Sequence, residues 1–159
     1  MQEARVLESR NEALLDSANK EAMELSPWAE AILRVLLAVA LGAGIGYQRE
    51  RAGKAAGLRT LVLVATGAAL FTVVSIFGFG VEGVDISRVA AGVVVGVGFL
   101  GAGVILRGRS EEEVAGLTTA ATIWVTAGVG LAAGAGLYLV AVIATVIVVG
   151  ILLLPKIRG

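Results

Sequence analysis

The side chains of this sequence that could do chemistry lie at the edges of long uncharged stretches. They are Arg49, Glu50, Arg51, Arg59, Thr60, Asp85 and Arg88. Cys and His are both absent, which excludes thiol redox chemistry, the usual zinc sites and every His-based nucleophile relay. The glycine-rich segments form no phosphate loop, because no Lys-Ser or Lys-Thr pair follows at the required place. We therefore expect no enzyme activity, no cofactor and no bound metal.

Each charged edge residue has a structural and a functional interpretation. Basic residues that face lipid headgroups are explained by topology alone, whereas Glu50 and Arg59 could form a polar network at the mouth of a bundle or dock a partner. Asp85 is placed to cap the next helix, with Ser87 as a rival cap and an ion-facing role as the alternative. No acidic residue lies deep in any uncharged stretch, which disfavours a self-contained magnesium pump.

Small and hydroxylated residues form the second group of candidates. Four glycines occur among the eight residues from Gly96 to Gly103, a segment that also contains Phe99. It either packs as a helix against neighbours or unwinds and lines a cavity. The glycine candidates are Gly96, Gly98, Gly101 and Gly103. Thr118, Thr119 and Thr122 lie near Trp124 and follow helical spacing, so bonds to their own backbone or to a neighbouring helix are expected before bonds to a solute.

The composition indicates that these elements are solvated by lipid. Of the 159 residues, 57% are hydrophobic and 16% are charged, against about 25% charged in an ordinary soluble domain. The mean hydropathy is +0.89. A lipid bilayer is therefore the expected partner, and nucleic acid is not.

Uncharged stretches predict five membrane-spanning helices. Three cover residues 28–47, 60–79 and 89–106, with Arg34 near one end of the first. Residues 114–154 contain no charge and are too long for one crossing, so they should form a hairpin that breaks within 128–136 and ends before Pro155. The expected fold is an all-α polytopic membrane protein.

Residues 1–26 differ from the rest. They form an acidic leader with Leu and Ala near helical spacing, which predicts an amphipathic helix on a membrane or partner, or a solvated tail. Ser26 and Pro27 then provide a good helix start. We expect two parts, the leader (1–26) and a transmembrane domain (27–159).

The Lys and Arg residues predict an orientation. The loop after the first span, the loop after the third span and the C-terminal tail share one side and hold eight basic residues, which are Arg49, Arg51, Lys54, Arg59, Arg107, Arg109, Lys156 and Arg158. The positive-inside rule therefore places the N terminus outside and the C terminus in the cytoplasm.

The sequence also contains an internal repeat with one constant offset. Residues 41–45 (LGAGI) return as 100–104 (LGAGV), and residues 56–60 (AGLRT) return as 115–119 (AGLTT). The second pair is displaced along the chain by the same amount as the first. This predicts a parallel repeat of two helix pairs, with a fifth helix outside the symmetry.

Five segments resemble the MgtC/SapB family of bacterial membrane proteins in the order expected for it. They are residues 46–51 (GYQRER), 56–60 (AGLRT), 85–91 (DISRVAA), 96–103 (GVGFLGAG) and 116–124 (GLTTAATIW). The resemblance covers residues 30–155 and implies a five-helix domain of the bacterial plasma membrane. It further implies a link to adaptation to low magnesium and, in some pathogens, to survival inside host cells. The family often continues into a soluble domain, and the leader is not part of its core.

Two functions remain open at this stage. One is a non-enzymatic regulator that docks other membrane proteins through glycine-rich helix faces, which are also compatible with a homodimer. The other is a small ion or solute channel or transporter with a pathway between the two repeats, lined by Gly96 to Gly103 and gated near Glu50, Arg59 and Asp85.

Overall fold

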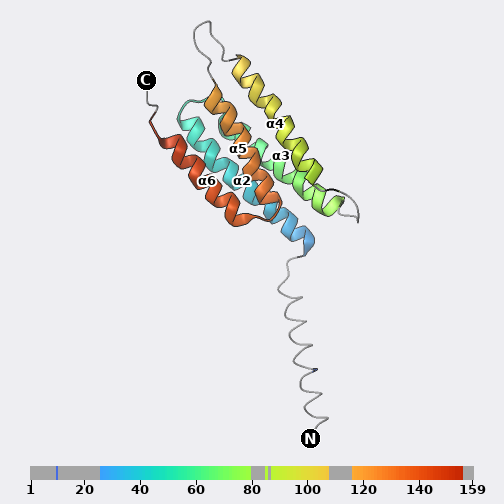
Figure 1. Ribbon diagram of the computed structural model, residues 1–159. Helices are drawn as coiled ribbons and strands as arrows, with labels where there is room; N and C mark the ends of the chain where they lie inside the picture. The colour runs from blue at the N-terminus through green and yellow to red at the C-terminus, as the bar shows by residue number, and fades with distance from the viewer. Residues whose placement is uncertain (1–9, 11–25, 80–84, 86, 108–115, 156–159) are drawn as a thin grey trace. The chain divides into compact units, whose positions relative to one another are not determined.

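The computed structural model describes residues 10, 26–79, 85, 87–107 and 116–155 (Figure 1). Within these residues the secondary structure is entirely helical, as expected. The helices are α2 (Pro27–Arg51), α3 (Leu58–Val73), α4 (Ser87–Arg107), α5 (Leu117–Gly134) and α6 (Tyr138–Leu153). α3 continues into a short π-helix, η1 (Val74–Gly78), which the sequence did not indicate.

Four of the helical segments are long and apolar enough to cross a membrane. They are Pro27–Arg51, Leu58–Gly78, Ser87–Ile105 and Leu117–Gly134. The fifth helix, Tyr138–Leu153, is apolar but has 16 residues, a length of about 24 Å. The expected set of five helices is present, and the last of them is shorter than a usual span.

The chain divides into two units, residues 1–30 and residues 31–159. In the first unit, Ser26 begins α2: its hydroxyl accepts a hydrogen bond from the amide of Ala29 at 3.3 Å. The predicted start at Ser26 and Pro27 is therefore confirmed. Apart from Arg10 and Ser26, the expected amphipathic leader lies outside the described residues, as do Arg109, Lys156 and Arg158.

The hairpin in the last long apolar stretch breaks at residues 135–137, at the end of the predicted range. Gly136 has a φ of +80°, a conformation that glycine adopts without strain. Gly128 and Gly130 lie inside α5, because a continuous helix keeps their backbone groups hydrogen-bonded. α6 ends at Leu153, before Pro155, as expected.

The segment from Gly96 to Gly103 is helical throughout and lies inside α4. The alternative in which this segment unwinds is therefore not observed. A helix that satisfies all of its own backbone hydrogen bonds suits a lipid environment, and this outweighs the low helix propensity of the four glycines.

α3 and α5 pack against each other through small residues at the centre of the second unit. A Cβ atom added to Gly134 would lie 2.7 Å from the carbonyl oxygen of Ala69, and one added to Gly130 would overlap the carbonyl oxygen of Ala65. Ala65 and Ala69 are fully buried. Gly130 and Gly134, four residues apart on α5, thus form a stripe of small residues that packs against α3.

The internal repeat is visible in matching contacts. α3 begins at Leu58 and α5 at Leu117, which are equivalent positions in the two copies of the repeat. Gly42 of α2 packs against Leu61 of α3, and at the equivalent positions Gly101 of α4 packs against Ala120 of α5. α2 and α4 also run in the same sense, since both are antiparallel to α5.

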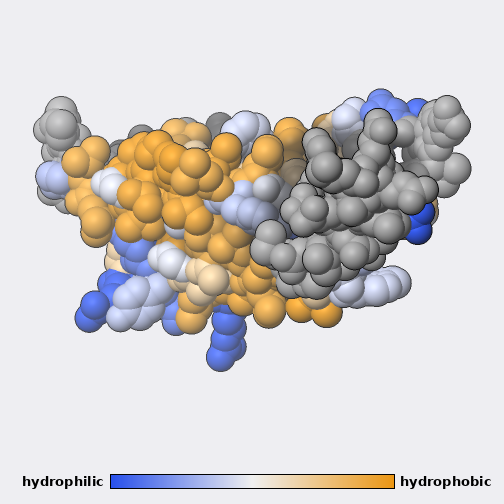
Figure 2. Space-filling model, turned by 90° about the horizontal axis from the view of Figure 1, so that it is seen from below, coloured by the Kyte–Doolittle hydropathy of each residue, from blue (hydrophilic) through white to orange (hydrophobic). Residues whose placement is uncertain are grey.

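Apolar residues form most of the coloured surface in the view of Figure 2. Among the exposed apolar side chains of the described residues are Phe99 on α4 and Leu139 on α6, at 80% and 72% exposure. Such a surface fits lipid and not water. The protein is a polytopic helical membrane protein.

Candidate functional site

Arg49 is a buried cation near the end of α2. Its side chain is 3% exposed, and its guanidinium donates a hydrogen bond of 2.6 Å to the hydroxyl of Thr119 in the first turn of α5. Beside it, the side-chain amide of Gln48 donates to the carbonyl oxygen of Leu152 in α6 at 3.1 Å. We call this end of the second unit, where α2 ends and α3 and α5 begin, the basic end.

Arg34 lies in the N-terminal half of α2. Its guanidinium donates a hydrogen bond of 2.9 Å to the carbonyl oxygen of Gly134, the last residue of α5, and lies 5.2 Å from the centre of the Phe77 ring in η1. Gly136 is required beside it, since a Cβ atom there would lie 3.0 Å from a guanidinium nitrogen of Arg34. The cation therefore caps the C-terminal end of α5.

The two arginines set one antiparallel register between α2 and α5. The separation between Arg34 and Arg49 along α2 equals the separation between their partners, Gly134 and Thr119, along α5. The partners come in the opposite order, so the two helices are antiparallel. At 1.5 Å per residue, the two bonds are about 22 Å apart along the helices. α2 is thus joined to α5 by polar bonds at Arg34 and at Arg49 inside an apolar bundle.

Glu50 caps the start of α3. Its carboxylate accepts a hydrogen bond of 2.7 Å from the amide of Leu58, the first residue of that helix. Gly57 lies next to it, and a Cβ atom there would lie 2.9 Å from the carboxylate, which would have to shift. Arg59 and Thr60 lie at the same helix start, and among the described residues no bond joins Glu50 to Arg59. Of the roles considered for Glu50, the structure shows a helix cap and not a bond to Arg59.

Arg51 forms a separate contact at the basic end. Its guanidinium lies over the ring of Tyr47, 5.4 Å from the ring centre. Both side chains are exposed, so the pair is a surface feature.

The threonines of α5 that form side-chain bonds follow the expectation, since their partners are their own backbone or the neighbouring helix α2. Thr122 donates to the carbonyl oxygen of Thr118 at 2.6 Å, and Thr126 donates to that of Thr122 at 2.7 Å. Thr119 instead accepts the bond from Arg49. Thr118 and Trp124 are exposed.

Asp85 binds the start of α4. Its carboxylate accepts hydrogen bonds from the Ser87 hydroxyl at 2.6 Å and the Ser87 amide at 2.9 Å. These two bonds, together with the nearby charge of Arg88, lower the pKa of Asp85 below its ordinary value. The capping interpretation is supported, and Asp85 itself, not Ser87, supplies the acceptor.

α4 carries its glycines on an open surface. A Cβ atom added to Gly92, Gly96, Gly98 or Gly103 would meet nothing within 4 Å, whereas one added to Gly101 would contact Ala120. Phe99 is exposed among them. Within the described residues, the Gly92 and Gly96 stripe therefore does not pack against another helix.

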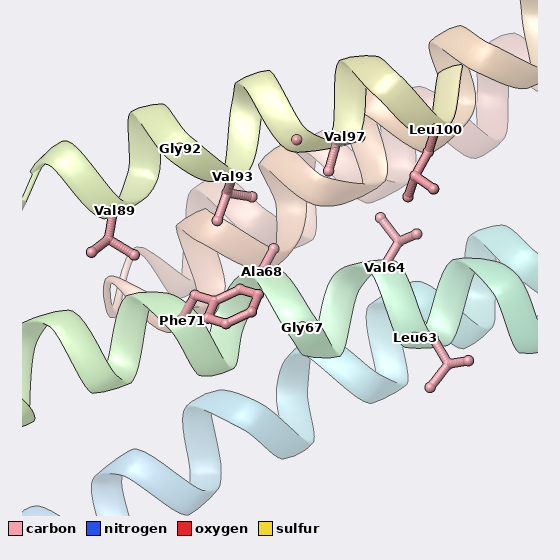
Figure 3. A pocket seen from close by; sticks show the side chains of 11 residues that line it. Leu63, Val64, Gly67, Ala68, Phe71, Val89, Gly92, Val93, Val97 and Leu100 are labelled. Carbon is pink, nitrogen blue, oxygen red and sulfur yellow. The ribbon is translucent and has the colours of Figure 1, made fainter. Parts of the chain in front are cut away.

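An apolar groove of about 620 Å³ runs between α3 and α4. Figure 3 shows Val97 and Leu100 of α4 facing Val64 of α3 across it. The lining residues are Leu63, Val64, Gly67, Ala68, Phe71, Val89, Gly92, Val93, Gly96, Val97 and Leu100.

Sequence reasoning missed the bonds of Arg34 and Gln48. Arg34 was visible as a charge inside a predicted span, and such a residue needs a polar partner within the bundle. Its partner is a backbone carbonyl 100 residues away, which no side-chain pattern reveals.

The comparisons with known proteins agree with this arrangement. The chain is 50% identical over 116 residues to the "Putative magnesium transporter YhiD" of Escherichia coli (strain K12), covering 69% of this chain and 53% of that protein. It is 45% identical over 129 residues to "Protein MgtC" of Salmonella typhimurium (strain 14028s / SGSC 2262), covering 81% and 52%. "Protein SrpB" of Synechococcus elongatus is 45% identical over 128 residues, covering 74% and 70%.

The chain thus spans about half the length of YhiD and MgtC. No solved structure matches it significantly. A sequence model of the MgtC family matches residues 35–157, which include every helix from the middle of α2 onward. The chain belongs to the MgtC family.

Proposed function

We propose that this chain is a non-enzymatic regulator that docks other membrane proteins in the bacterial plasma membrane, with a role in magnesium homeostasis. The observation that carries the proposal is the open glycine face of α4, where added side chains at Gly92 and Gly96 would meet nothing within 4 Å. Small residues on an open helix face allow another helix to approach closely in lipid. The magnesium link is supported by the name of the relative YhiD, which describes that protein as a magnesium transporter.

The contacts between the repeats favour regulation over transport. α3 and α5 meet with no room for a methyl group at Gly130 or Gly134, so the centre between the repeats is closely packed. Gly98 and Gly103 do not line the groove between α3 and α4, and a Cβ atom added to either would meet nothing within 4 Å. No acidic residue lies in 60–79, 89–106 or 114–154, and bound Mg²⁺ usually takes one or two carboxylates.

Transport remains the second candidate, because YhiD carries that description. Purified protein in liposomes should then pass Mg²⁺ or another solute, and Arg49→Gln should change the flux. Tight vesicles across a broad panel of ions and solutes would remove this candidate.

The orientation belongs to the same proposal: the basic end faces the cytoplasm. Arg49, Arg51, Lys54 and Arg59 gather there, at the end of α2 and the start of α3. Since the chain has no cysteine, Ala52→Cys and Phe79→Cys each give one labelling site. In intact cells an impermeant maleimide should label Phe79→Cys and leave Ala52→Cys unmodified, and the opposite pattern would reverse the orientation.

The docking itself is tested by crosslinking in native membranes. Val95 on α4 and Val146 on α6 are 76% and 66% exposed, so Cys at either position should be tolerated. Val95→Cys should capture a distinct membrane protein that Val146→Cys does not capture, and deleting the gene for this chain should change that partner's activity. Recovery of self-crosslinks alone at Val95→Cys would contradict the proposal.

A further inference from the structure

α6 lies outside the repeat. Its contacts show which kind of helix packs against the two helix pairs. It packs against α5 and lies beside α2 in Figure 1, and Gln48 of α2 binds the carbonyl oxygen of Leu152. Its buried residues are Ala141 and Thr145, which are four residues apart. The position between α2 and α5 is thus filled by an uncharged helix that presents small side chains.

The repeat gives this position a counterpart. In the repeat, α2 corresponds to α4 and α3 corresponds to α5. Exchanging the two helix pairs therefore turns the position of α6, against α2 and α5, into a position against α4 and α3. The apolar groove lies between those two helices. Within the described residues, no helix of this chain occupies it.

Burial differs sharply between corresponding residues on the two sides. Leu63 of α3 lines the groove and is 71% exposed, whereas its counterpart Thr122 on α5 is 3% exposed. Val97 of α4 is half-buried, whereas its counterpart Ala38 of α2 is fully buried. The groove is therefore the uncovered counterpart of a covered surface.

The groove has the length and chemistry of a helix site. Along α4 it extends from Val89 to Leu100, about 16 Å or three turns. Gly67, Gly92 and Gly96 lie in its walls and permit close backbone approach. Its lining contains no charged residue, so it offers no ion pair to a charged ligand.

We propose that the groove binds one transmembrane helix of a second membrane protein, with the chemistry of α6: uncharged along its buried length and with small side chains four residues apart. This names the partner class for the regulator proposed above and rests on that proposal. The α6 of a second copy of this chain is not available for the groove, because it is already packed against its own α2 and α5. The open α4 of a second copy is the competing occupant, and the test below distinguishes it from a second protein.

The test uses the full chain in liposomes of phosphatidylethanolamine and phosphatidylglycerol. A donor dye is placed on Ala52→Cys, and the probe is an acceptor-labelled peptide with the sequence of residues 137–155. Energy transfer should rise with peptide density and saturate. Gly96→Leu should weaken the association about tenfold, which corresponds to about 1.4 kcal/mol.

Gly98→Leu is the matched control, because Gly98 lies on the same helix, has equally open space and does not line the groove. It should leave the association unchanged. Gly92→Leu, on the groove wall, should repeat the effect of Gly96→Leu, and circular dichroism should show that all three variants keep their helices.

Three results would overturn the inference. The first is energy transfer to the peptide that never saturates, and the second is equal affinity of the Gly96→Leu and Gly98→Leu proteins for the peptide. The third is energy transfer between two labelled copies of the chain, if Gly96→Leu abolishes it and the peptide does not displace it. The last result would assign the groove to a second copy. If the peptide fails while Val95→Cys still captures a partner with altered activity, the regulator proposal stands and only this groove assignment falls.

Discussion

The guanidinium of Arg49 and the hydroxyl of Thr119 are joined by a hydrogen bond of 2.6 Å that links the end of α2 to the start of α5. Thr119→Val keeps the shape of the side chain and removes the acceptor, so a nearly buried cation loses its partner. We expect the free energy of unfolding to fall by about 1 to 3 kcal/mol. Unfolding in a detergent titration followed by circular dichroism measures the change.

The control for this bond is Thr118→Val, one residue earlier on the exposed side of α5. Its stability should stay within about 0.5 kcal/mol of the parent protein. Equal loss in the two variants would show that the hydroxyl of Thr119 is not the important partner.

Gly130→Ala should be strongly destabilising, because the added methyl group would overlap the carbonyl oxygen of Ala65 on α3. We expect a loss of about 2 kcal/mol or more from overpacking. Gly128→Ala in the same helix meets nothing within 4 Å and should be neutral or stabilising by up to about 1 kcal/mol. Thermal unfolding of both purified variants decides the matter, and similar melting temperatures would contradict the close approach of α3 and α5.

Glu50→Ala should weaken the start of α3 by removing the acceptor for the Leu58 amide. Loss of a helix cap costs about 0.5 to 2 kcal/mol. Glu50→Gln keeps an oxygen acceptor and should recover part of that loss. Hydrogen exchange at the first amides of α3 should rise most in Glu50→Ala, and unchanged exchange there would speak against the cap.

Asp85 should make the start of α4 sensitive to acid. Its pKa is lowered in the folded protein by the bonds from Ser87, so the charged carboxylate stabilises the fold above its ordinary pKa of 3.8. That stabilisation is lost as the pH falls through the lower, folded-state pKa. The stability difference between the parent protein and Asp85→Ala should therefore be present at pH 6 and shrink at low pH. A difference that stays constant with pH would exclude the carboxylate as its source.

The sequence predicted the helices well, because lipid imposes length and forbids charge along each span. It could not tell which glycine stripe is covered. Gly92 and Gly96 have the same spacing as Gly130 and Gly134, yet the first pair faces open space and the second contacts α3. Spacing defines a face of one helix, whereas coverage depends on which helix lies opposite.

The candidate site was predicted less completely for the same reason. Glu50 and Asp85 bind partners at most eight residues away in the sequence. The local pattern of residues was therefore informative about the cap at Asp85. Arg34 and Arg49 reach partners 100 and 70 residues away. Their roles follow from the antiparallel contact of α2 with α5, which only the three-dimensional arrangement reveals.

The paired bonds of Arg34 and Arg49 have a mechanical consequence. Sliding α2 along α5 by one helical turn, about 5.4 Å, requires both guanidiniums to release their oxygens at once. α2 and α5 should therefore move as one rigid piece. We therefore expect α4 to be the helix that moves when a partner binds. Within the described residues, no polar side chain anchors its outer surface.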